Sequence, residues 1–183
     1  MEEGLFCVSL LKRLFGNSGD DQAAVRPLWH RVVEIAREPG WYETGVHGGG
    51  IADSLAGRFD TVSLVLALVM LRMEGDEALR GPAARLTELF VSDMDGQLRQ
   101  SGVGDLVVGK RIGKLMSALS GRIDAYRAGL AQADDTALVA AVARNVTLGD
   151  NGDAGAIAKE MRVLAAVLAA TGDSDLLAGR IAR

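Results

Sequence analysis

The sequence has few of the residues that cross-link small proteins or build aromatic-rich sheets. Among its 183 residues there is one cysteine, Cys7, which excludes an internal disulfide, and only 4% are aromatic. Hydrophobic residues make up 49%, with much alanine and leucine, and charged residues make up 24%. This composition favours helix over sheet and excludes a wholly disordered chain or a disulfide scaffold. A chain of this length buries roughly 70% of its unfolded surface, so a core is expected without disulfide or metal support.

Long apolar runs and an excess of positive charge are also missing. The longest strongly apolar stretch, residues 62–71, is much shorter than the ~20 residues of a membrane-spanning helix. Glu2 and Glu3 precede the first apolar run, whereas Lys12 and Arg13 follow it, which is the wrong order for a secretory signal. We therefore predict a cytoplasmic protein that is free or rests on a membrane surface. The net charge of −4 argues against DNA binding, because phosphate contacts usually require a basic excess.

Apolar periodicity predicts an all-α fold, a single compact domain of about six to eight helices around a buried central helix. The central helix is expected at residues 55–73, because the sequence from Val62 to Met73 is apolar on every side. Further helices are expected at about residues 22–37, 81–101, 105–128, 134–144 and 153–171, with a short one after Asp173. Residues 1–20 are expected to form an amphipathic or flexible segment, packed on the body or touching a membrane, and residues 21–183 the helical domain.

A run of three glycines, Gly48 to Gly50, interrupts the helical pattern. Consecutive glycines give the backbone its greatest freedom. The sequence therefore predicts that this loop is the most mobile internal segment and the place where binding rearranges the chain.

No group of residues carries recognisable catalytic or metal-binding chemistry. Gly104 to Lys110 matches part of a phosphate-binding loop, but Arg111 stands where that loop needs Ser or Thr, and no strand precedes it. His30 and His47 are the only histidines, without further zinc ligands and without a Ser–His–Asp or Cys–His set. We therefore predict a protein that is not an enzyme and that holds no metal and no cofactor.

One helical strip is basic. At ~100° per residue, Arg111, Lys114 and Arg122 lie within roughly 80° of one another on the helix expected at residues 105–128, bordered by Leu115 and Tyr126. Such a strip is either an ordinary solvated face or a docking surface for an acidic protein segment, anionic headgroups or RNA.

The sequence from Phe90 to Tyr126, FVSDMDGQLRQSGVGDLVVGKRIGKLMSALSGRIDAY, resembles the ubiquinol–cytochrome c chaperone family. The family's signature resembles DMDxxLRExGVGDLxVGKRxK followed by YGRxxAY. Upstream, residues 53–59 and 36–42 resemble the family segments DTxxGRFE and ARxPxFY, so the resemblance spans about residues 28–126. Val65 stands where the family often has histidine, Ser120 replaces an aromatic residue, and the glycine run looks like an insertion.

The resemblance implies a non-enzymatic assembly chaperone that binds newly made cytochrome b and supports assembly of the ubiquinol–cytochrome c reductase complex. It also implies contact with the ribosome, and a place in the cytoplasm, peripherally at the inner face of the inner membrane. Together with the basic strip it predicts a partner-binding surface of Arg58, Arg99, Asp105, Lys110, Arg111, Lys114, Arg122 and Tyr126. Arg58 and Arg99 lie near helix ends with Asp residues close by, and a structural role is an equal alternative for them. Two other functions stay open: a ribosome- or RNA-contacting factor that uses the same strip, and a helical protein with a small-ligand pocket.

Overall fold

The structure, a computed structural model, describes residues 22–45, 48–100 and 108–183, without the side chains of residues 95, 97–100 and 108–112. Seven α-helices and two 3-10 turns make up this part of the chain, whose only bridge of strand type pairs Ile51 with Leu148. The helices are α3 (Arg26–Ala36), α4 (Leu55–Met73), α5 (Arg80–Gln100), α6 (Val108–Leu130), α7 (Thr136–Asn145), α8 (Ala154–Ala170) and α9 (Asp173–Leu177), and the 3-10 turns are η1 (Pro39–Trp41) and η2 (Glu77–Leu79). The all-α prediction is confirmed.

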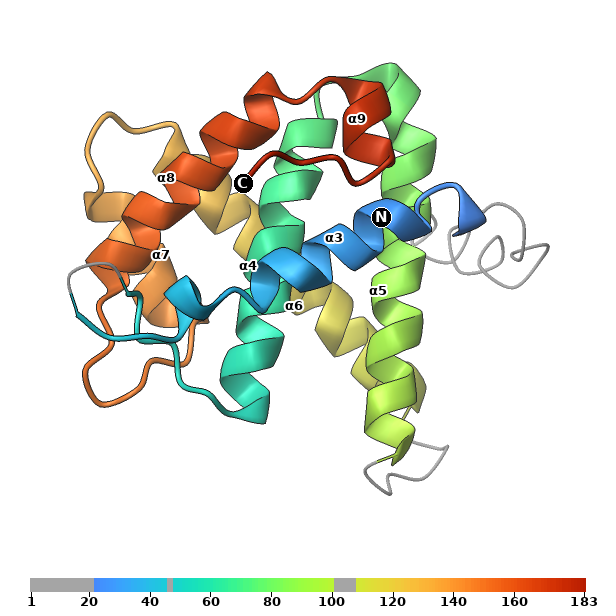
Figure 1. The fold of residues 1–183 in the computed structure, drawn as a ribbon. Helices are drawn as coiled ribbons and strands as arrows, with labels where there is room; N and C mark the ends of the chain where they lie inside the picture. Colours follow the sequence, from blue (N-terminus) through green and yellow to red (C-terminus); the bar gives the residue numbers. More distant parts are fainter. Residues whose placement is uncertain (1–21, 46–47, 101–107) are drawn as a thin grey trace, which may run out of the picture.

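Helix α4 runs through the middle of the molecule and packs against α3, α5, α6 and α8 (Figure 1). It begins and ends where the sequence predicts, and its residues from Leu64 to Val69 are all buried. Ser54 caps its start by accepting a hydrogen bond from the Gly57 amide at 3.1 Å. The buried hydroxyl of Thr61 donates to the Gly57 carbonyl at 2.8 Å, so this polar group costs the core little.

Helices α6 and α7 pack closely against each other, and α8 packs against α7. A Cβ on Gly129 would lie only 2.8 Å from the Cα of Leu138, so glycine is required for this approach. Arg162 of α8 binds Asp135 at 2.5 Å. Its guanidinium also donates to the carbonyls of Gly129 and Leu130 at the end of α6 and of Gln132 and Asp134 in the turn that follows. One arginine thus pairs with four carbonyl groups around the turn, where helical partners run out.

The glycine run is a packed segment, which differs from the mobile loop that the sequence predicts. Gly48 to Gly50 are all buried. The Gly50 amide donates to the Glu43 carbonyl at 2.8 Å, and the Gly49 carbonyl accepts from the Asp153 amide at 3.0 Å. A Cβ on Gly49 would lie 2.6 Å from the side chain of Ile157, and Gly50 has a φ of +63°. The glycines therefore allow close packing against the segment between α7 and α8.

The remaining helices agree with the prediction except at their ends. Helix α3 begins at Arg26 instead of about residue 22, and α6 extends to Leu130 instead of about residue 128. The segment 1–20 lies outside the described residues, so its separation from the helical domain stays a prediction. Among the described helices, none combines the length and the hydropathy that crossing a membrane requires.

Candidate functional site

A cleft of about 690 Å³ lies between α3, the first turns of α4, α5 and the segment that follows α3. Most of its lining is apolar: Trp29, Val33, Pro39, Tyr42, Leu55, Phe59, Val62 and Met94. Charged side chains complete it: Arg37, Glu43, Asp53, Arg58 and Asp93. The cleft thus combines an apolar lining with a mixed set of charges.

Trp29 and Phe59 form an aromatic wall of the cleft, and both contact the buried ring of Phe90 behind it. The rings of Phe59 and Phe90 have centroids 6.2 Å apart, and those of Trp29 and Phe90 are 6.1 Å apart with an interplanar angle of 72°. The Trp29 indole donates a hydrogen bond to the Asp93 carboxylate at 2.5 Å, and the Tyr42 hydroxyl donates to the Ala36 carbonyl at 2.7 Å. These contacts fix the rings in place, because edge-to-face pairs and satisfied polar ends restrict their rotation.

The rim of the cleft carries an unusually exposed leucine. Leu55, the first residue of α4, has 78% of its surface exposed; Val163 on α8, at 54%, is the other large apolar side chain exposed to this degree among the described residues. Because Leu55 lines the same cleft as Trp29, Phe59 and Met94, it extends their apolar surface to the rim, and a contiguous exposed apolar surface is typical of an interaction site. The arrangement is suited to binding an apolar segment.

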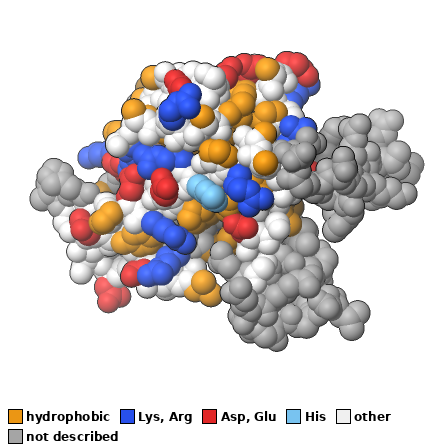
Figure 2. Space-filling model, turned by 45° about the vertical axis from the view of Figure 1, so that its right-hand side comes forward, with side chains coloured by type: hydrophobic (Ala, Val, Ile, Leu, Met, Phe, Trp, Pro, Cys, Tyr) orange, Lys and Arg blue, Asp and Glu red, His pale blue; other side chains and the backbone are white. Residues whose placement is uncertain are grey.

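Charges at the rim are partly paired. Arg58 binds Asp53 at 2.7 Å, and this hydrogen bond, with the charge of Arg58, lowers the pKa of the Asp53 carboxyl. On the face of the molecule in Figure 2, Lys and Arg side chains lie beside Asp and Glu side chains, with hydrophobic side chains exposed between them. Positive charge is therefore not gathered into one patch among the described residues on this face.

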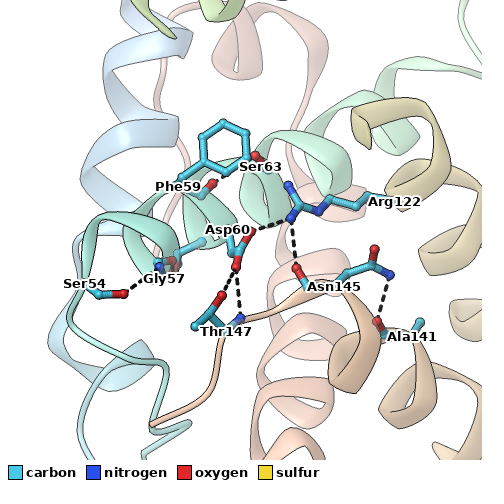
Figure 3. Close-up of polar contacts among 10 residues, drawn as sticks. Ser54, Gly57, Phe59, Asp60, Ser63, Arg122, Ala141, Asn145 and Thr147 are labelled. Carbon is cyan, nitrogen blue, oxygen red and sulfur yellow. Dashed lines mark hydrogen bonds and ion pairs between the residues drawn. The ribbon is translucent and has the colours of Figure 1, made fainter. Parts of the chain in front are cut away.

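A buried ion pair lies next to Phe59 (Figure 3). Asp60 and Arg122 are 7% and 9% exposed, and the Nη2 of Arg122 binds the Oδ1 of Asp60. The same nitrogen donates to the Asn145 carbonyl at 3.0 Å. The other oxygen of Asp60 accepts two hydrogen bonds from Thr147, from its amide at 2.9 Å and from its hydroxyl at 2.7 Å. The guanidinium carbon of Arg122 lies 5.4 Å from the centroid of the Phe59 ring.

Tyr126 lies one helical turn after Arg122 and is also buried. Its hydroxyl has no hydrogen-bond partner among the described residues. Burial raises the pKa of this hydroxyl to about 12, and the nearby charge of Arg122 acts in the opposite direction. The side chain is part of the core and offers no atom to a partner at the surface.

The residues predicted to bind a partner therefore occupy different environments. Arg58 is exposed at the rim of the cleft, and Lys114 is exposed on α6. Arg122 and Tyr126 are buried, so neither side chain lies at the surface where direct contact with a partner was predicted. Asp105 and the side chains of Arg99, Lys110 and Arg111 lie outside the described residues. Partner binding through Arg58 and Lys114 stays a prediction. No group of three or more His, Cys, Asp or Glu side chains that could hold a metal ion occurs within the described ranges.

The sequence interpretation overlooked the aromatic residues of the cleft. Trp29, Tyr42 and Phe59 lie on three separate segments, so no spacing rule connects them. A signal was present all the same. Tyr42 and Phe59 belong to the two upstream segments of the family resemblance, and aromatic residues are scarce in this chain.

Comparison with known proteins relates this architecture to a protein family. The model of the ubiquinol-cytochrome C chaperone family matches residues 48–183. The crystal structure of the Cbp3 homolog from Brucella abortus matches with a TM-score of 0.75 and 30% sequence identity, over 99% of this chain and 95% of that chain. None of the curated proteins compared matches this chain. The family match extends well past residue 126, where the resemblance recognised in the sequence ends, and includes α7, α8 and α9.

Proposed function

Because the chain belongs to the ubiquinol–cytochrome c chaperone family, we propose that it binds newly made cytochrome b and supports assembly of the ubiquinol–cytochrome c reductase complex. In this proposal it acts in the cytoplasm, peripherally at the inner face of the inner membrane, and catalyses no reaction. The apolar cleft is the observation that supports a client-binding role beyond the family match.

The cleft suits an apolar segment of a membrane protein before that segment enters the bilayer. Phe59 and Trp29 supply a rigid aromatic wall, and Leu55 stands out at the rim, where a client first meets the surface. Burying a leucine-sized side chain contributes roughly 1.5–3 kcal/mol, so a few such contacts hold a client reversibly. Reversible binding is what a chaperone needs, because the client must later leave for the complex.

The test is co-purification from detergent-solubilised membranes of cells that make the reductase. The wild-type chain should retain cytochrome b, measured by quantitative mass spectrometry against the tagged chaperone. Leu55→Asp should lower this ratio by about tenfold, since a charge replaces an apolar anchor. The fold should persist, because an acidic residue is favourable in the first turn of a helix.

Val163→Asp is the matched control, because Val163 is also a strongly exposed apolar side chain and it does not line the cleft. It should leave the co-purification unchanged. Absence of cytochrome b from the wild-type sample, together with normal reductase levels in cells lacking the protein, would overturn the proposal. Retention of ribosomal RNA with a steep salt dependence would instead favour the ribosome-contacting alternative.

A further inference from the structure

We propose that Arg122 is a positioning residue for client binding: through its buried pair with Asp60 it holds the ring of Phe59 in the wall of the cleft. This inference rests on the proposed function of the cleft. It gives Arg122 a role that differs from the direct surface contact expected from the sequence.

Phe59 and Asp60 are neighbours in the first turns of α4 and point in different directions. Consecutive helical residues are ~100° apart, so fixing one side chain fixes the direction of the next. Asp60 is held by Arg122 of α6 and by Thr147 in the segment between α7 and α8 (Figure 3). These contacts fix the direction of Asp60 in the first turns of α4, and the neighbouring Phe59 lines the cleft.

The guanidinium of Arg122 also acts on Phe59 directly. Its carbon lies 5.4 Å from the ring centroid, within the range of an attraction between a cation and a ring face. Phe59 in turn contacts Phe90, and Phe90 contacts Trp29. A displacement of Arg122 would therefore move Phe59 directly, and Phe59 is part of the aromatic wall.

The same pair holds the rim of the cleft. Thr147, which binds Asp60 twice, accepts a hydrogen bond from the Ala52 amide through its carbonyl at 2.9 Å. Ala52 directly precedes Asp53, and Leu55 follows Asp53 by two residues. Asp53 and Leu55 both line the cleft. Wall and rim are thus attached to one buried ion pair.

A buried ion pair is a poor way to gain stability, since an apolar pair of similar volume is often at least as stable. It does have strict directional requirements, because a displaced charge is left without compensation. Such a pair is suited to fixing geometry, and here the geometry it fixes is that of the cleft.

The experiment compares two ion pairs that both join α4, or its C-cap, to α6. The double variant Asp60→Leu/Arg122→Met removes the buried pair without leaving a lone charge, and should stay folded as judged by circular dichroism and thermal unfolding. Its ratio of co-purified cytochrome b should fall about tenfold, within the usual range of coupling between contacting residues. The control Glu74→Leu/Arg127→Met removes the exposed pair at the other end of α4, and should leave the ratio unchanged.

A double-mutant cycle identifies the route of the effect. If Arg122 acts through Phe59, then Phe59→Leu weakens co-purification in the wild-type background but has little further effect in Asp60→Leu/Arg122→Met. If the two effects add, the inference is wrong. Should the double variant fail to fold, Arg122→Lys provides the test, because it keeps the charge but lacks the planar guanidinium over Phe59, and its ratio should also fall.

These results separate the inference from the proposed function. If Leu55→Asp loses cytochrome b while the folded variant without the buried pair keeps it, only the role of Arg122 is refuted. If Leu55→Asp itself has no effect, the cleft is not the client site.

Discussion

Removing Asp60 alone is expected to destabilise the protein strongly. In Asp60→Ala, Arg122 keeps the Asn145 carbonyl but loses its counter-charge, and the amide and hydroxyl of Thr147 lose their acceptor. Leaving one partner of a buried pair uncompensated costs 3–5 kcal/mol in comparable cases, so we expect a loss of about 4 kcal/mol in the free energy of unfolding. For a chain of this size, that loss corresponds to a decrease of about 8–16 °C in Tm.

Urea denaturation followed by circular dichroism at 222 nm measures this loss directly. The slope m should stay constant, because the unfolded surface is nearly unchanged. Arg127→Ala provides the comparison, since its ion pair with Glu74 is about half exposed and should be worth less than about 1 kcal/mol. The reasoning from burial would be refuted if Asp60→Ala lost less than about 1 kcal/mol. It would also be refuted if Asp60→Leu/Arg122→Met, which removes both charges, lost as much stability as Asp60→Ala.

Three further predictions concern other parts of the structure and are tested by urea denaturation. Because burial raises the pKa of Tyr126 to about 12, the folded state retains its proton, and about 3 kcal/mol of stability present below pH ~10 should disappear as the pH rises to ~12. Tyr126→Phe should remove this alkaline loss without cost at pH 7; an unchanged pH profile would contradict the assignment. Gly50→Ala should cost about 2 kcal/mol because of its positive φ, whereas Gly75→Ala, whose Cβ meets open space, should be neutral. Arg162→Met should cost about 3 kcal/mol, because Asp135 and several carbonyls of the turn lose their donor, and a loss no larger than that of an exposed arginine would show that water replaces it.

The helices were predictable from the sequence, but the environments of their side chains were not. The sequence from Val62 to Met73 is apolar on every side, and a helix of this kind is buried by its neighbours on all sides, so α4 lies where it is predicted. Helical periodicity predicts the direction in which a side chain leaves the helix. It does not predict which other segments bury that side chain at its position along the axis. Lys114 and Arg122 lie within about 80° of each other around α6 but about 12 Å apart along it, and only Arg122 is covered by the segment that contains Thr147.

The cleft was not predictable for a related reason. Trp29, Tyr42 and Phe59 meet only through the packing of α3 and its following segment on α4. The glycine run shows the same limit at the level of the backbone. A flexible loop and a closely packed backbone both favour glycine, so the sequence alone does not distinguish them. The position of the Ile157 side chain against Gly49 shows that this segment is closely packed.

The bond between Asp60 and Thr147 has a consequence for the order in which the protein is made. These residues are 87 positions apart in the sequence, and a contact across such a separation must wait for a long loop to close. A ribosome releases the chain from its N-terminal side, so α4 is synthesised well before the residue that sets its rotation. The first turns of α4, and the cleft with them, reach their final arrangement only after the segment between α7 and α8 has left the exit tunnel. We therefore expect the proposed client-binding cleft to form only late in the synthesis of the chain.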